Sequence, residues 1–286
     1  MAIKLIASDV DGTILHYKQK YHTYTRDALL RAADAGILTT LATGRSFSTA
    51  WPLYSELGMT APLITLNGAV VRDRVMVYRN HLVDFSTLQP AIDFAREEDL
   101  FCMFFHGDEL YAAHTEQECR SLIEAIGFSE EEGRLIRPFC GLEELYERCE
   151  CQVNKIIFLW EQPDKNGASP MARVQKKLKR YLNDAIFPPF VEMTTSYHNN
   201  VELMPRGVNK GTGLAELCEA FQILPNEVMC FGDNENDIGM FDFAGHSVAM
   251  GNASKEVQQH ARYVTGTVDE GGVGQMIDRV LAGEIS

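Results

Sequence analysis

The chain has 286 residues, of which 45% are hydrophobic and 23% are charged, and these proportions exclude a wholly disordered protein. Lys and Arg together number 26 against 40 for Asp and Glu, which gives a formal net charge of -14. A protein this acidic repels phosphate backbones at long range, so we expect no nucleic acid partner.

The first part of the chain alternates short apolar runs with helical patterns. An apolar run at residues 3–8 ends at Asp9, and Gly36 follows a helical pattern as a stop signal. The patterns predict strands over 3–8, 38–44 and 62–68 and helices over 25–35 and 46–57. Such short strands, apolar on both faces, are typical of a parallel sheet that helices cover on both sides.

The middle of the chain, from about residue 84 to residue 190, has longer strand-like runs with charged and aromatic positions. Strands are expected within 100–113 and 151–160, helices near 86–98, 115–126 and 170–182, and turns at 106–109 and 197–200. This pattern predicts an α+β domain at 85–190, inserted into a core of residues 1–84 and 191–286. The joints are expected near 80–85 and 187–200.

The alternating pattern returns after the predicted insertion. It predicts helices over 210–221, 237–243 and 273–282 and strands over 227–233, 246–251 and 262–266. The fold class expected from the whole chain is therefore α/β, with a Rossmann-like parallel-sheet core and an inserted α+β domain.

Polar residues follow the ends of the apolar runs. Taken alone, the segment DVDGT (9–13) could be a capped Asp-Gly turn, and Lys210 could be a solvated charge. Four such segments stand at expected strand ends or helix starts: 9–13, 41–45, 209–211 and 232–237. Because open α/β sheets bind ligands beyond the carboxyl ends of their strands, the four segments together indicate one site.

These motifs resemble those of the haloacid dehalogenase superfamily of phosphohydrolases. More narrowly, the chain is similar to the Cof-like branch, in which a large α/β cap is inserted between the second and third motifs. The matching segments are DVDGT (9–13), LATGR (41–45), Asn67-Gly68-Ala69, GVNKG (207–211) and GDNENDIGM (232–240). They occur in the family's order, and the resemblance covers essentially the whole chain.

The resemblance implies how these residues would act on a phosphate ester. Asp9 would be the nucleophile and would carry the phosphoryl group as an aspartyl-phosphate. Asp11 would protonate the departing alkoxide and then deprotonate the attacking water, with its pKa raised by the adjacent carboxylate. Thr43 and the Gly44 amide would bind the phosphoryl oxygens, and Lys210 would supply a fixed positive charge.

The resemblance also implies a Mg²⁺ cofactor, since Mg²⁺ prefers hard oxygen ligands. Its expected ligands are Asp9, Asp233 and the backbone carbonyl of Asp11, with Asp237 contacting the ion directly or through water. The expected phosphate- and substrate-binding residues are Val10, Gly12, Gly44 and Asn236.

The function implied is a Mg²⁺-dependent phosphatase of small phosphorylated metabolites, such as sugar phosphates or phosphorylated cofactors. Two alternatives stay open: a phosphomutase that returns the phosphoryl group to a sugar, and a regulatory module that keeps phosphate on Asp9 without turnover. The seven cysteines and the lack of an export signal or long apolar stretch predict a cytoplasmic protein with reduced thiols and no membrane span. The oligomeric state and the substrate are left open.

Substrate contacts outside the motifs are harder to place. The segment 16–24 is basic and aromatic, and it could touch substrate or be a solvated loop before a helix that Thr25 caps. In the expected cap, Asp108, Glu109 and the turn at 197–200 are candidates for reading the leaving group.

Overall fold

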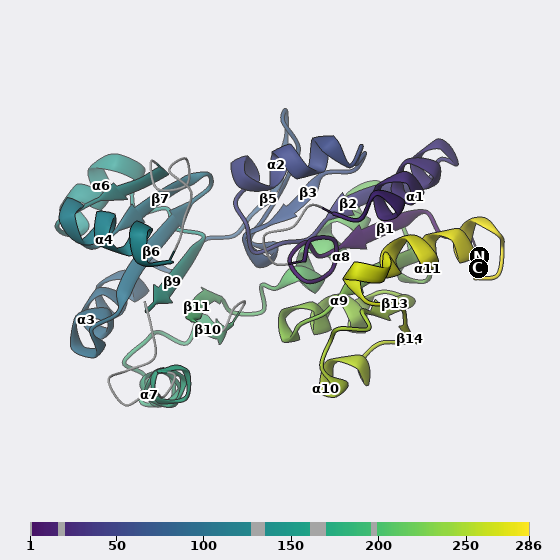
Figure 1. Ribbon diagram of the computed structural model, residues 1–286. Coiled ribbons are helices and arrows are strands. Elements are labelled where there is room, and N and C mark those ends of the chain that lie inside the picture. Colours follow the sequence, from purple (N-terminus) through teal and green to yellow (C-terminus); the bar gives the residue numbers. More distant parts are fainter. Residues whose placement is uncertain (1, 17–20, 127–134, 161–169, 196–198, 286) are drawn as a thin grey trace. The chain divides into compact units, whose positions relative to one another are not determined.

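The computed structural model divides the chain into two units, each built around its own sheet (Figure 1). Unit 1 comprises Met1–Asn80 and Val208–Ser286, and unit 2 comprises His81–Gly207. The structure describes residues 2–16, 21–126, 135–160, 170–195 and 199–285.

Unit 1 contains a five-stranded parallel sheet in the order β14-β13-β12-β1-β2. Its strands are β1 (Leu5–Ser8), β2 (Leu38–Leu41), β12 (Val228–Gly232), β13 (His246–Ala249) and β14 (Tyr263–Val264). In the register of this sheet, Leu5 pairs with Val228 on one side and with Leu38 on the other. The predicted α/β class with a parallel core is confirmed.

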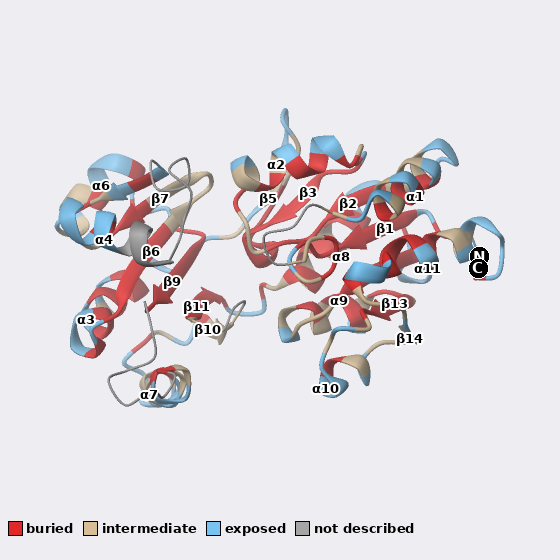
Figure 2. Ribbon diagram, in the orientation of Figure 1, coloured by how far each residue is buried: buried red, intermediate tan, exposed pale blue. Residues whose placement is uncertain are grey.

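Helices cover both faces of this sheet, as its apolar pattern predicts. They are α1 (Thr23–Asp34), α2 (Phe47–Glu56), α8 (Lys210–Phe221), α9 (Ile238–Phe243), α10 (Lys255–Gln258), α11 (Gly272–Leu281) and the short 3-10 helices η3 (Pro225–Glu227), η4 (Glu235–Asp237) and η5 (Val268–Glu270). In β1, Ile6 packs with residues of α1, α2 and α11, whereas Leu5 and Ala7 pack with residues of α8 and α9. Every residue of β1 and β12 is buried, and β1 is drawn in red in Figure 2.

The strand expected over 62–68 is shorter and belongs mainly to a small antiparallel sheet. This sheet consists of β3 (Leu63–Thr65), β4 (Val70–Arg72) and β5 (Val77–Asn80). A single parallel bridge, Ala42 to Ile64, connects β3 with the end of β2. The strand stops after Thr65 because the chain turns into η1 (Leu66–Gly68), where Asn67 takes the left-handed conformation with φ 54°.

Unit 2 contains a six-stranded sheet in the order β10-β11-β9-β6-β7-β8. Its strands are β6 (Phe101–His106), β7 (Glu109–Ala112), β8 (Ile136–Pro138), β9 (Lys155–Leu159), β10 (Val191–Thr194) and β11 (Asn200–Pro205). All neighbouring pairs are antiparallel except β7 and β8. The expected turn at 106–109 is confirmed, since His106 pairs with Glu109.

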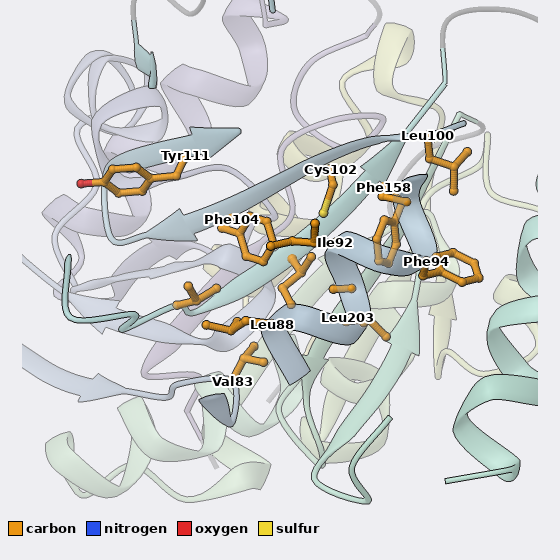
Figure 3. Packing of buried hydrophobic residues seen from close by; sticks show 14 of the residues in the cluster. Val83, Leu88, Ile92, Phe94, Leu100, Cys102, Phe104, Tyr111, Phe158 and Leu203 are labelled. Carbon is orange, nitrogen blue, oxygen red and sulfur yellow. The ribbon is translucent and has the colours of Figure 1, made fainter. Parts of the chain in front are cut away.

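One face of this sheet carries the main hydrophobic core of unit 2. The helical elements of the unit are η2 (Phe85–Thr87), α3 (Leu88–Glu98), α4 (Glu116–Ile126), α6 (Leu142–Cys149) and α7 (Met171–Asn183). Ile92 and Phe94 of α3 pack against Phe104 of β6, Phe158 of β9 and Leu203 of β11 (Figure 3). The rings of Phe94 and Phe158 meet edge to face with centroids 5.1 Å apart, an arrangement that aromatic pairs favour.

Two sequence-based expectations are corrected by the structure. The second joint lies at residue 207 and not at 190, because β10 pairs with β11 and β11 pairs with β9 within the sheet of unit 2. Helix α1 begins at Thr23 and is capped by His22, whose Nδ1 accepts a hydrogen bond from the Tyr24 amide, so Thr25 is not the cap.

The cysteines at positions 102, 119, 140, 149, 151, 218 and 230 are all free thiols. Among the helices within the described ranges, none has both the length and the apolar character that crossing a membrane requires.

Candidate active site

Three loops meet at the carboxyl edge of the parallel sheet. Asp9 follows β1, Thr43 lies just beyond β2, and Asp233 follows β12. Because these strands are parallel neighbours, their carboxyl ends lie at one edge. Gly12 lets the first loop turn back there: its φ is +90°, and a Cβ at this position would lie 2.2 Å from an Asp233 carboxylate oxygen.

A buried ionic cluster is the centre of the site. The ammonium of Lys210 donates to Oδ1 of Asp9 and to Oδ1 of Asp237, at 2.6 Å in both cases. Lys210 is 1% exposed, Asp9 5% and Asp237 0%. The cluster is therefore out of contact with bulk water. Charge pairs interact far more strongly in such a buried environment than at the surface.

Local structure fixes the position of Lys210. It is the first residue of α8, and the Asn209 side chain caps that helix by accepting from the amides of Gly211 and Thr212. A Cβ on Gly211 would lie 2.1 Å from the Gly239 carbonyl oxygen, so the start of α8 packs directly on the backbone of α9. The helix N-terminus adds positive potential beside the ammonium.

The acids of the third loop are held by the loop's own backbone. Asp237 uses its second oxygen, Oδ2, to accept from the amides of Asp233 and Asn234, at 2.9 and 3.0 Å. Asp233 accepts from the Thr13 hydroxyl at 3.0 Å, which links the third loop to the first. The carboxylates are thus oriented before any ligand binds.

Burial dominates the electrostatics of these acids. Burial raises the pKa of Asp9 well above its usual range, with Lys210 opposing the rise and Asp237 and Asp233 adding to it. Burial, with help from Asp237, raises the pKa of Asp233 to about 6. Burial lowers the pKa of Lys210, but Asp237 and Asp9 outweigh it, so the net shift is upward and the ammonium stays charged.

The acids of the cluster suit a divalent cation. Asp9, Asp233 and Asp237 each offer a carboxylate oxygen, and these oxygens lie within 4.8 Å of one another. Asp9 and Asp237 are buried and Asp233 is partly buried, and when all three are ionised their charges outnumber that of the single Lys210 ammonium. Hard oxygen ligands at this density fit Mg²⁺ better than softer metals.

A second group of polar side chains lies beside the cluster. Thr43 is 1% exposed, and its carbonyl accepts from the amide of Asn67. Asn67 in turn accepts from the Asn236 side chain at 3.3 Å, and a Cβ on Gly44 would lie 3.1 Å from the Asn67 side chain. The expected phosphate ligands Thr43, Gly44 and Asn236 are therefore brought together around Asn67.

Sequence reasoning gave no role to Asn67 beyond its place in a motif. Its signal was available, since an Asn-Gly pair after a strand favours a left-handed turn.

Val10 differs from its expected role in another way. Its side chain packs in the core and its carbonyl accepts from the amides of Ile14 and Leu15, so only its backbone is available to a ligand.

Asp11 does not share the buried cluster. Its side chain is 57% exposed, and both carboxylate oxygens accept from the guanidinium of Arg45, at 2.5 and 2.9 Å. The acids that add to the rise in the pKa of Asp9 are Asp237 and Asp233. The Arg45 guanidinium attracts the Asp11 carboxylate, whereas ionised acids of the buried cluster would repel it.

The candidates outside the motifs contact their own units. Tyr21 donates to Glu56, and Tyr24 donates to Asp278, so this end of the 16–24 segment is bound to the core, while 17–20 lie outside the described residues. In unit 2, Glu109 pairs with Arg137 at 2.8 Å.

Of the predicted turn at 197–200, residues 197 and 198 lie outside the described ranges and Asn200 is buried in β11. Asp108 is half-buried in the turn between β6 and β7.

Known proteins match the chain over nearly its whole length. A family model described as haloacid dehalogenase-like hydrolase matches residues 6–277. A 5-amino-6-(5-phospho-D-ribitylamino)uracil phosphatase of Bacillus subtilis is 26% identical over 99% of both chains. A pyridoxal phosphate phosphatase of Escherichia coli is 29% identical over 97% of this chain and 98% of its own. The crystal structure of a haloacid dehalogenase-like hydrolase from Bacteroides thetaiotaomicron has a TM-score of 0.79 at 25% identity, covering 97% of this chain and 99% of that one.

Proposed function

The chain belongs to the haloacid dehalogenase-like hydrolases and is a phosphatase, and from this premise we propose that it hydrolyses small phosphate monoesters through a phosphoryl group carried on Asp9. The single observation that carries this proposal is the buried Asp9 carboxylate at the end of β1. Its Oδ1 accepts a hydrogen bond from the Lys210 ammonium at 2.6 Å. A carboxylate fixed in this way can attack phosphorus without first losing a water shell.

In the first step, an oxygen of Asp9 attacks phosphorus and the ester P–O bond breaks, with its electron pair going to the leaving oxygen. Asp11 gives that oxygen a proton. In the second step, Asp11 takes a proton from water, the water oxygen attacks phosphorus, and the bond to Asp9 breaks to release inorganic phosphate. Lys210 stabilises the negative charge on the transferring group, and Thr43 and Gly44 bind its oxygens.

Asp9, Asp233 and the Asp11 backbone carbonyl would hold Mg²⁺, with Asp237 in direct or water-mediated contact. When bound, Mg²⁺ would neutralise part of the charge that keeps an anionic nucleophile away from a phosphate dianion. The carboxylate oxygens of Asp9, Asp233 and Asp237, which lie within 4.8 Å of one another, support this assignment.

The names of the relatives suggest which substrates to test first. Two of these relatives are named as phosphatases of a phosphorylated ribitylaminouracil and of pyridoxal phosphate. Both compounds contain a phosphate ester and a nitrogen heterocycle. We propose that this chain takes a phosphorylated cofactor, a cofactor precursor or a sugar phosphate, and that residues 81–207 form the cap that selects it.

The test is phosphate release from a panel of sugar phosphates, nucleotides, pyridoxal phosphate and flavin mononucleotide, with Mg²⁺ and with chelator. Asp9→Asn keeps an oxygen for Lys210 and should fold normally while losing turnover by at least a thousandfold, roughly the effect of removing a nucleophile. Release that persists in Asp9→Asn would show that Asp9 is not the nucleophile. A requirement for a sugar bisphosphate activator would identify a mutase, and a stable phospho-Asp9 without release would identify a phospho-switch.

A further inference from the structure

The contact between Asp11 and Arg45 is bidentate and uses both carboxylate oxygens of Asp11. Nη2 of Arg45 lies 2.5 Å from Oδ1 of Asp11, and Nε lies 2.9 Å from Oδ2. This is the bidentate geometry in which a planar guanidinium binds a carboxylate. With both oxygens held, Asp11 cannot approach the leaving oxygen of a substrate in this arrangement.

The backbone of Arg45 is part of the loop proposed to bind phosphate. Its amide donates to the Thr43 hydroxyl at 3.2 Å, and its carbonyl accepts from the Leu66 amide at 3.0 Å. The guanidinium is therefore anchored two residues after Thr43 and one residue after Gly44. Its side chain is 33% exposed, so a ligand arriving from solvent can reach it.

An arriving phosphate ester can compete for this guanidinium. Exposed ion pairs contribute little net free energy, so opening the Arg45–Asp11 pair is easy. A phosphate dianion carries more charge than a carboxylate and accepts the same bidentate pattern. The competitor is thus the substrate itself.

We propose that Arg45 exchanges partners in each catalytic cycle, an inference that rests on the proposed phosphatase function. Arg45 holds Asp11 in the free enzyme and passes to the phosphoryl oxygens of the bound ester. Asp11 is then released to contact the leaving oxygen only when a phosphate ester is present. Arg45 is both a substrate-binding residue and a positioning residue for Asp11.

A double-mutant cycle on phosphate affinity tests the exchange. Binding of inorganic phosphate is measured by calorimetry in saturating Mg²⁺ for wild type, Arg45→Met, Asp11→Asn and the double variant. Arg45→Met should weaken binding by about tenfold or more, as expected for a lost charged hydrogen bond pair. Asp11→Asn should tighten binding, because the guanidinium no longer has a rival, and this gain should shrink strongly in the Arg45→Met background.

The cycle has two outcomes that overturn the proposal. Equal tightening by Asp11→Asn in both backgrounds would show simple charge repulsion between Asp11 and phosphate. Unchanged affinity in Arg45→Met would show that Arg45 never binds phosphate. Both readouts are independent of turnover, so the exchange can fail while the phosphatase assay succeeds, and the reverse.

Kinetics and a matched control complete the test. With an active substrate, Arg45→Met should raise KM more than it lowers kcat, and the KM of Arg45→Lys should lie between those of Arg45→Met and wild type. A fall in kcat at constant KM in Arg45→Met would overturn the exchange. Arg31→Met removes another exposed pair of the same length, Arg31 to Asp278 at 2.5 Å, on the helices α1 and α11. Arg31→Met should change neither phosphate affinity nor KM. If it weakened phosphate binding as Arg45→Met does, the effect of Arg45→Met would not be local to the site.

Discussion

Replacing Lys210 with methionine is the sharpest test of the buried cluster. Met fills a similar volume but leaves the carboxylates of Asp9 and Asp237 without the ammonium that contacts both at 2.6 Å. Since these three groups are at most 5% exposed, water cannot replace the lost contacts. Removing one partner of a buried ion pair typically costs about 3–5 kcal/mol, and we expect Lys210→Met to lose that much free energy of unfolding in metal-free buffer.

Magnesium should restore part of this loss. Without the ammonium, the three carboxylates hold a larger excess of negative charge and should bind the cation more tightly than wild type does. Turnover should fall by about 10²–10³-fold even with Mg²⁺, as when one charge-stabilising donor is removed from an active site.

The chain contains two tryptophans, Trp51 in unit 1 and Trp160 in unit 2, so each unit has its own fluorescent reporter. Urea unfolding of Trp160→Phe variants reports on unit 1 alone. Lys155→Met is the matched control, since Lys155 forms a buried pair with Glu202 at 3.2 Å in unit 2. It should destabilise unit 2, read through Trp160 in a Trp51→Phe background, with no response to Mg²⁺.

A loss below about 1 kcal/mol in metal-free Lys210→Met would refute the reasoning, because it would mean that the acids gain nothing from the ammonium. A loss that Mg²⁺ leaves unchanged would refute the assignment of the acids as a cation site.

Two further predictions concern backbone packing and acid stability. Gly68→Ala should greatly reduce activity and stability, because a Cβ there would lie 2.0 Å from a backbone oxygen at the start of α8. Gly36 also has a positive φ but open space around it, so Gly36→Ala should lose only about 1 kcal/mol of unfolding free energy in urea. Equal losses in the two variants would disprove the packing argument. Hydrogen bonds from Tyr24 and then Arg31 hold the pKa of Asp278 below its usual value of 3.8, so its contribution to stability is fully present above about pH 5 and is lost as pH falls through the lowered pKa. The difference in unfolding free energy between wild type and Asp278→Asn should therefore be constant near neutral pH and shrink in acid; a constant difference down to pH 2 would contradict it.

The elements with strong local signals could be predicted from the sequence. Helix α8 runs over Lys210–Phe221 as predicted, because Asn209 supplies a capping box at its start and apolar residues recur at helical spacing. The hairpin formed by β4 and β5 was not predicted. Its strands are three and four residues long, and β5 is largely exposed, so its sequence carries no clear apolar alternation.

The end of the inserted unit illustrates a limit of local reasoning. Residues 191–194 and 200–205 form strands of the unit 2 sheet because β10 pairs with β11 and β11 pairs with β9, more than forty residues earlier in the chain. Pairing between distant strands depends on the whole sheet and leaves no mark in a short window of sequence.

For the candidate site, the sequence could indicate which residues gather but not which atoms touch. Asp9, Lys210 and Asp233 come together because each stands at a strand end or helix start on one edge of the sheet. The sequence did not indicate that the Asp11 side chain contacts Arg45. That contact depends on side-chain distances and exposure, which the spacing of motifs does not contain.

The order of strands in the parallel sheet has a consequence for biosynthesis. Strand β1 lies between β2 and β12, and Lys210 is 201 positions beyond the Asp9 that it contacts. At a synthesis rate of about 5–20 residues per second, β1 leaves the ribosome roughly 10–40 s before Lys210 and β12 do. Unit 2 is complete in that interval, whereas β1 still has an open, apolar edge, the kind of strand that aggregates or recruits chaperones. Release of a chain truncated before residue 210 would thus yield a complete inserted unit joined to an incomplete core that is prone to aggregate.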